Sequence, residues 1–193
     1  MNNIIFDLGG VILNLDYQET VRAFKKIIPN LDDSTFYGKE NQLEFFSLYE
    51  TGKITTQDFL ARFNSQYNSQ LSLEEFKKAW NAMLFDIPKS RLNLLSSLKP
   101  KRLFLLSNIN EIHEDAVGDL TPYFEKVYYS HRIGLRKPNP EIFKLVLKEN
   151  NLDLHDTLFI DDSEQHIRGA QSIGLQSIHL KKPLTIEDLQ ELK

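Results

Sequence analysis

The sequence predicts an α/β fold, a doubly wound parallel sheet with helices on both faces. Five short apolar or β-branched runs are spaced along the chain, and helical patterns separate the last four of them. Runs of this kind are typical of parallel strands that are buried on both faces. Strands that alternate with helices form right-handed crossover units. The 193 residues suffice for one such domain with a modest insertion.

The predicted core elements follow one another in a regular order. The strands are expected at residues 4–6, 102–106, 126–130, 157–161 and 176–180. Apolar residues at helical spacing predict helices at 111–119, 140–149 and 165–173, and a short final helix is expected at 183–193. Pro140 suits the first turn of its helix, and Gly174 suits the end of the helix before it.

Residues 16–87 interrupt this rhythm, because they show helical patterns and no convincing strand. Helices are expected at 17–28, 41–51, 55–67 and 72–84. Thr55 gives one helix a hydroxyl cap with an acid in its first turn, and Ser72 and Glu75 have the spacing of a capping box. We therefore expect a small helical cap at 16–87, inserted after the first strand of a core made of 1–15 and 88–193. An insertion there overhangs the edge of the sheet where ligands bind.

Composition narrows the function classes. A net charge of −4 provides no field that would gather nucleic-acid phosphates, so no nucleic-acid partner is expected. The absence of cysteine excludes disulfides, thiolate catalysis and cysteine-bound zinc. No signal peptide is evident, and no apolar run approaches the roughly 20 residues that span a bilayer. We expect a cytoplasmic protein with no membrane partner, as a monomer or a weak homodimer.

Carboxylates stand at the ends of two predicted strands. Asp7 follows the apolar run 4–6, and Asp161 and Asp162 close the run 157–161. Adjacent carboxylates repel each other and resist burial. A divalent cation relieves that repulsion, and Mg²⁺ prefers carboxylate ligands. Parallel strands gather their carboxyl ends at one edge, so these residues are expected to meet in a magnesium site.

Three further polar residues lie near the ends of predicted strands or just before a core helix. Ser107 and Asn108 come directly after the second strand, and Lys137 precedes the helix at 140–149. A hydroxyl, a backbone N–H and a fixed positive charge can hold phosphoryl oxygens. Asp7 could then attack phosphorus and form an aspartyl-phosphate, which divides hydrolysis into two easier steps. Each residue alone could be a cap or a solvated side chain, but together they favour phosphoryl transfer.

The chain resembles the haloacid dehalogenase superfamily. That resemblance is carried by four motifs in order, Asp7-Leu8-Gly9, Ser107-Asn108, Lys137-Pro138 and Asp161-Asp162. It implies a Rossmann-like core with a cap after the first strand, Mg²⁺ as cofactor and a small phosphorylated substrate. It also implies that Asp7 is nucleophile and metal ligand, and that Ser107, Asn108 and Lys137 bind the phosphoryl group. The backbone oxygen of Gly9 and the carboxylate of Asp162 would contact the metal, and Asp161 would do so directly or through water.

Gly9 departs from the most common pattern of that superfamily. Most of its phosphatases have a second Asp there, which protonates the leaving group and then activates water. Asp-Leu-Gly is instead similar to a branch that includes sugar-1-phosphate phosphatases, notably the α-glucose-1-phosphate phosphatases. Loss of acid–base assistance costs about 10²–10⁴ in rate. Acidic leaving groups need that assistance less, so a sugar phosphate is the expected substrate.

Two alternatives stay open at this point. The superfamily also includes metal-free 2-haloacid dehalogenases, although the pair Asp161 and Asp162 makes little sense without a cation. A catalytically degenerate member that binds phosphoryl ligands or a protein partner is favoured only by Gly9.

Some cap and core residues have less certain roles. In the cap, the candidates to contact substrate are Arg22, Glu40, Glu44 and Tyr49. In the core, no histidine has zinc-like spacing with another, so structural roles are expected for His113, His131 and His166.

Overall fold

The computed structural model describes residues 1–31, 36 and 43–182, and within them it contains a five-stranded parallel sheet in the order β3-β2-β1-β4-β5. The strands are β1 (Asn3–Phe6), β2 (Arg102–Ser107), β3 (Lys126–Tyr129), β4 (Thr157–Asp161) and β5 (Gln176–His179). Phe6 at the end of β1 pairs with Leu105 on one side and Ile160 on the other. The carboxyl ends of the three central strands are therefore level with one another. The predicted parallel α/β fold is confirmed.

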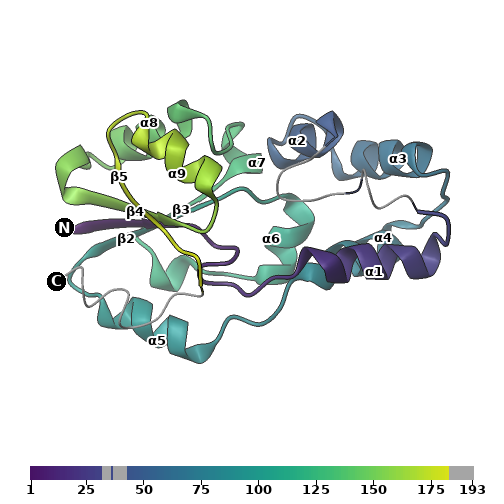
Figure 1. The fold of residues 1–193 in the computed structure, drawn as a ribbon, viewed down its shortest axis with the longest axis horizontal. Helices are drawn as coiled ribbons and strands as arrows, with labels where there is room; N and C mark the ends of the chain where they lie inside the picture. Colours follow the sequence, from purple (N-terminus) through teal and green to yellow (C-terminus); the bar gives the residue numbers. More distant parts are fainter. Residues whose placement is uncertain (32–35, 37–42, 183–193) are drawn as a thin grey trace.

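Helices cover both faces of the sheet, as Figure 1 shows. Helices α8 (Pro140–Glu149) and α9 (Glu164–Gln171) lie on one face, and α5 (Lys89–Ser97) lies on the other. Side chains of β1 alternate between the two layers. Ile5 packs with the apolar residues of α8 and α9, whereas Ile4 and Phe6 pack with those of α5. This alternation is what a strand buried on both faces requires.

The described residues between β1 and the start of α5 form helices around an aromatic core of their own. They are α1 (Tyr17–Ile27), α2 (Glu44–Glu50), α3 (Thr56–Gln66), α4 (Leu73–Trp80) and a 3₁₀ turn, η2 (Asn81–Met83). The largest buried side chains there are Phe24, Phe46, Phe59, Phe63, Phe76 and Trp80. The capping box predicted at Ser72 is present at the start of α4, and the hydroxyl cap predicted at Thr55 also forms a capping box, with Asp58, at the start of α3. The strands of the sheet point toward this helical layer (Figure 1).

The helical layer contacts the core at several places, two of which lie beside the connecting segments. The two connecting segments pair side by side, with Asp16 N donating to Met83 O at 2.9 Å and Phe85 N donating to Asn14 O at 3.0 Å. His113 of α6 (Glu111–Val117) stacks on Trp80, with ring centroids 5.2 Å apart. Burial lowers the pKa of His113 to about 4, so the ring is neutral at pH 7. The domain boundaries at 15/16 and 87/88 stay a prediction.

Several predicted bounds shift by a few residues. The expected strand 126–130 stops at Tyr129, because Ser130 begins a short helix, α7 (Ser130–Ile133). The expected helix 72–84 divides into α4 and η2, and α6 ends at residue 117 where Gly118 follows. Helix α5 was not predicted, and the final helix expected at 183–193 lies outside the described residues.

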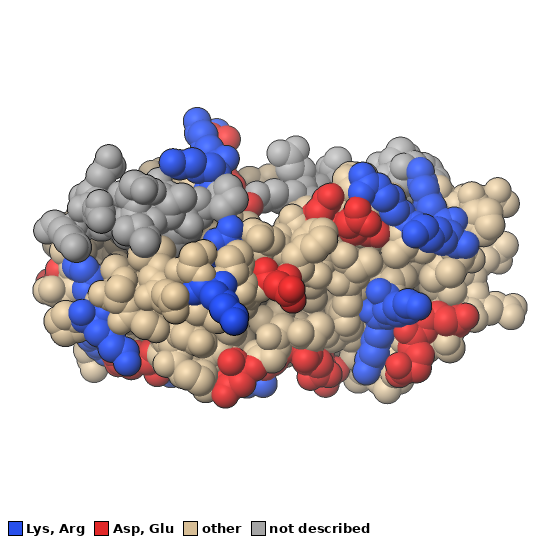
Figure 2. All heavy atoms as spheres, turned by 90° about the horizontal axis from the view of Figure 1, so that it is seen from below, with Lys and Arg blue, Asp and Glu red and all other residues tan. Residues whose placement is uncertain are grey.

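Among the described residues, no helix is both long and apolar enough to cross a bilayer. On the face drawn in Figure 2, Lys and Arg side chains form small groups that alternate with Asp and Glu.

Candidate active site

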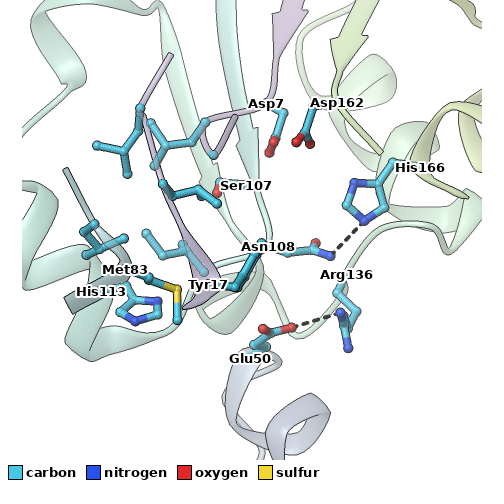
Figure 3. Close-up of a pocket in the computed structure, with 16 residues that line it drawn as sticks. Asp7, Tyr17, Glu50, Met83, Ser107, Asn108, His113, Arg136, Asp162 and His166 are labelled. Carbon is cyan, nitrogen blue, oxygen red and sulfur yellow. Dashed lines mark hydrogen bonds and ion pairs between the residues drawn. The ribbon is translucent and has the colours of Figure 1, made fainter. Parts of the chain in front are cut away.

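The predicted site residues converge at the carboxyl edge of the sheet. Asp7 follows β1, Ser107 ends β2, and Asp162 follows β4. These three residues and Asn108 line one cavity of about 80 Å³ between the sheet and the helical layer (Figure 3). Asp7 and Ser107 are buried, with 7% and 4% of their surfaces exposed, and both line this cavity.

Lys137 bonds to residues at the ends of three strands, β1, β2 and β4. Its side chain is fully buried, and Nζ donates to Asp7 Oδ1 at 2.6 Å and to Asp161 Oδ2 at 2.7 Å. A third bond at 2.8 Å goes to the backbone oxygen of Leu106. Burial opposes the positive charge, but Asp161 and Asp7 hold the pKa of Lys137 above its usual value. Lys137 is therefore a fixed ammonium that orients two carboxylates.

Asp7, Asp161 and Asp162 form a compact carboxylate cluster. Each offers an oxygen, and these oxygens lie within 4.8 Å of one another. Burial raises the pKa of Asp7 to about 7, although Lys137 opposes that rise. Burial would raise the pKa of Asp161 too, but Lys137 and His166 hold it below its usual range. Three carboxylates thus lie near a single ammonium group, and a further positive charge would reduce the repulsion among them.

The donor set fits a divalent cation. Asp161 already accepts bonds from Lys137 Nζ at 2.7 Å and from the backbone N–H of Ser163 at 2.7 Å. Asp162, in contrast, extends from the end of β4 toward Asp7 on the cavity side (Figure 3). Two carboxylates that converge in this way are the hard oxygen ligands that Mg²⁺ prefers. The arrangement favours Asp7 and Asp162 as direct ligands, with Asp161 behind them.

Gly10 allows Asp162 to approach the first strand. Its φ is +77°, a region that side-chain-bearing residues rarely adopt. A Cβ atom at this position would lie 2.2 Å from Asp162 Oδ2, so any larger residue would displace that carboxylate. Sequence reasoning missed this role, because the close approach joins positions far apart in the chain.

Asn108 acts on the loop that carries Lys137. Its Nδ2 donates to Lys137 O at 2.9 Å, and its Oδ1 accepts from Lys137 N at 2.9 Å. Because both polar atoms of this side chain bond to Lys137, the group of Asn108 that can contact a phosphoryl oxygen is its backbone N–H. His166 was expected to be structural, yet its Nδ1 lies 2.9 Å from Asp161 Oδ2 and its ring lines the cavity. His113 and His131 bond to backbone oxygens, as structural histidines do.

The cap residues that line the cavity differ from those expected. Arg22 and Glu44 are exposed on α1 and α2, and Glu40 lies outside the described residues. Tyr49 stacks on Phe59 with centroids 4.2 Å apart and so belongs to the aromatic core. The cavity is instead lined on this side by Tyr17, Glu50, Met83 and Leu84. Arg22, Glu44 and Tyr49 thus have ordinary surface or packing positions, because helix rotation and docking decide which face meets the cavity.

Comparison with known proteins agrees with this geometry. A family model described as haloacid dehalogenase-like hydrolase matches residues 1–174. A D-ribitol-5-phosphate phosphatase of Bacteroides thetaiotaomicron is 30% identical over 187 residues, which cover 92% of this chain and 90% of that protein. A phosphorylated carbohydrates phosphatase of Thermotoga maritima is 25% identical over 192 residues, covering 93% of this chain and 84% of that one.

A solved structure extends the likeness to three dimensions. A haloacid dehalogenase family enzyme of Bacteroides thetaiotaomicron, crystallised with magnesium and inorganic phosphate, superposes with a TM-score of 0.91. It is 32% identical, and the match covers 98% of each chain. The family match, the parallel sheet and the converging acids and lysine lead to one conclusion: the chain belongs to the haloacid dehalogenase-like hydrolases.

Proposed function

We propose that this protein is a Mg²⁺-dependent phosphatase that hydrolyses a small phosphorylated metabolite through an aspartyl-phosphate on Asp7. The observation that carries the proposal is the position of Asp7. It lies at the wall of the cavity, bonded to Lys137 Nζ at 2.6 Å and grouped with Asp161 and Asp162. A nucleophilic carboxylate needs nearby positive charge to meet an anionic phosphoryl group, and this site supplies it.

The chain's own residues have distinct parts in the two displacements. In the first, an oxygen of Asp7 bonds to phosphorus while the bond to the leaving oxygen breaks, and the leaving oxygen takes a proton from solvent because Gly9 offers none. In the second, water attacks the same phosphorus and gives a proton to solvent while the bond from phosphorus to Asp7 breaks, which releases inorganic phosphate and the free carboxylate. Ser107 Oγ and the backbone N–H of Asn108 hold phosphoryl oxygens, and Lys137 keeps Asp7 oriented. Mg²⁺, held by Asp7, Asp162 and the backbone oxygen of Gly9, would neutralise charge between nucleophile and substrate.

A sugar or polyol phosphate is the substrate class that we favour. The cavity of about 80 Å³ suits a small organic group rather than a nucleotide. Two relatives that cover most of the chain are named for phosphorylated polyols or carbohydrates. The grouped carboxylates also weigh against a metal-free dehalogenase, since three acids within 4.8 Å repel one another and Lys137 supplies a single positive charge among them.

The proposal is tested by measuring phosphate release from D-ribitol 5-phosphate, hexose phosphates and p-nitrophenyl phosphate. We expect release with Mg²⁺ and its loss when EDTA is added, with recovery when Mg²⁺ is restored. Circular dichroism before and after chelation checks that the protein stays folded. A folded sample that releases no phosphate from any substrate would overturn the proposal. Release of halide from a 2-haloacid in the presence of EDTA would favour dehalogenase chemistry instead.

Replacing Gly9 with Asp tests the missing acid–base group. A Cβ at position 9 would lie 2.5 Å from Leu15 Cδ2, so the space for this side chain is filled by Leu15. We expect Gly9→Asp alone to gain little, and Gly9→Asp with Leu15→Ala to raise kcat for alkyl phosphates by about tenfold or more.

The matched control is Leu15→Ala alone, measured on the same substrates. p-Nitrophenyl phosphate has a good leaving group and should gain least from the added acid. An equal gain of the double variant on alkyl and aryl phosphates would show that leaving-group protonation is not what limits the rate.

A further inference from the structure

A second polar group lies in the cavity, apart from the acids and the lysine. Tyr17 begins α1, Glu50 ends α2, and Arg136 precedes Lys137 in the core. All three line the same cavity as Asp7, on the side that faces the helical layer (Figure 3). We call these three residues the cap-side polar group. The mechanism proposed above gives them no part.

Glu50 and Arg136 pair across the cap and the core. Arg136 Nη2 lies 3.0 Å from Glu50 Oε2, and their side chains are 26% and 4% exposed. A carboxylate this deeply buried stays ionised only beside a cation, and a paired guanidinium supplies one. The pair therefore presents a fixed acceptor and a fixed donor to the cavity, with no net charge.

Tyr17 adds a hydroxyl donor to this pair. Burial raises the pKa of Tyr17, and Glu50 is the largest of the neighbouring charges that raise it further. The phenol is therefore protonated at neutral pH and can donate a hydrogen bond. Apolar residues of the wall are Leu13, Leu15, Met83, Leu84 and Ile109, and the rings of His113 and His166 line it as well.

We propose that the cap-side polar group binds the hydroxyls of an uncharged polyol chain whose phosphoryl end lies at Asp7. The inference rests on the proposed phosphatase function and specifies its substrate class. Glu50 accepts hydrogen bonds from substrate hydroxyls, and Tyr17 and Arg136 donate to hydroxyl oxygens. Substrate hydroxyls replace the hydrogen bonds to water that these side chains lose when the cavity is filled, whereas an alkyl group of the same length does not.

The charges of Glu50 and Arg136 explain why the polyol chain of the substrate is expected to be uncharged. A carboxylate on the distal end of the substrate would be repelled by Glu50 and attracted by Arg136, so the pair would not compensate for the hydration that the carboxylate loses in a cavity of low dielectric. The same holds for an ammonium group, with the two residues exchanged. Because Glu50 and Arg136 cancel, a neutral hydroxyl is the group that interacts with both and repels neither.

The experiment compares three substrates with the same five-carbon length and the same phosphoryl end. They are D-ribitol 5-phosphate, pentyl phosphate, which lacks hydroxyls, and ribonate 5-phosphate, which ends in a carboxylate. We expect the unmodified protein to prefer D-ribitol 5-phosphate in kcat/KM. Tyr17→Phe and Glu50→Gln should each reduce that preference over pentyl phosphate by about tenfold, mostly through KM.

Glu50→Gln has a second, charge-specific readout. Because it removes the negative charge but keeps the shape, it should raise kcat/KM for ribonate 5-phosphate relative to D-ribitol 5-phosphate. Tyr17→Phe should leave that ratio unchanged. Glu44→Gln, an exposed acid on the same helix, is the matched control and should alter neither ratio.

The outcomes separate the inference from the proposed function. Equal losses on all three substrates would overturn the inference and leave Glu50 and Tyr17 as positioning residues. Unmodified protein that hydrolyses pentyl phosphate as well as D-ribitol 5-phosphate would also overturn it, while the phosphatase function stands. No Mg²⁺-dependent hydrolysis of any substrate, p-nitrophenyl phosphate included, would instead reject the proposed function.

Discussion

Asp7→Asn is expected to reduce turnover by about 10⁴-fold or more while leaving the fold intact. The amide has nearly the shape of the carboxylate, and it removes one of three negative charges that lie within 4.8 Å. Because burial already raises the pKa of Asp7 to about 7, losing its charge should not lower the free energy of unfolding in the absence of Mg²⁺. An amide is not a competent nucleophile toward phosphorus, so the covalent step is lost.

Two measurements check this prediction. The first is kcat with p-nitrophenyl phosphate at saturating Mg²⁺, and the second is mass spectrometry of rapidly quenched samples. The unmodified protein should show a fraction with one added phosphoryl group, and Asp7→Asn should show none. Asp86→Asn, an exposed acid, is the control and should behave as the unmodified protein does. Full turnover in a verified Asp7→Asn sample would exclude Asp7 as nucleophile.

The parts of the site that follow the strands were predictable from sequence. An apolar run that stops at Asp7 or at Asp161 marks a strand end, and parallel strands bring such ends to one edge of the sheet. Lys137 was predictable as a nearby cation, because it lies in the segment that leads into α8. The register of β1 with β2 and β4 then accounts for their convergence.

Residues whose roles depend on docking were not predictable in this way. Glu50 and Tyr17 reach the cavity because of how the helical layer sits over the sheet. Nothing in their local sequence distinguishes them from Glu44 or Tyr49, which lie elsewhere. Helical periodicity identifies a buried face, but it does not say whether that face meets a core or a cavity.

Contacts between distant backbone segments form a second unpredictable class. Only glycine fits at position 10, because a Cβ atom there would collide with the carboxylate of Asp162. The side chain of Asn108 donates a hydrogen bond to the backbone oxygen of Lys137. A glycine after a strand has many local explanations, and an asparagine near a helix start reads first as a cap. Only the three-dimensional structure shows which long-range partner each one serves.

Lys137→Met is expected to affect stability and activity together. Lys137 is fully buried and bonds Asp7, Asp161 and the backbone of Leu106. Removing one partner of a buried ion pair leaves charge unbalanced, so the free energy of unfolding without Mg²⁺ should fall by about 3–5 kcal/mol. Loss of its charge beside the reacting phosphoryl group should reduce kcat by about 10²–10³-fold.

Mg²⁺ distinguishes this electrostatic role from simple packing. If Lys137 balances the carboxylates, then a divalent cation at Asp7 and Asp162 takes over part of that balance. Added Mg²⁺ should therefore raise the melting temperature of Lys137→Met more than that of the unmodified protein. Lys148→Met, an exposed lysine on α8, should show the same Mg²⁺ response as the unmodified protein. An equal response of all three proteins would mean that Lys137 only fills space and does not balance the charge of the carboxylates. The positive charge needed for phosphoryl transfer at Asp7 would then have to come from the metal alone.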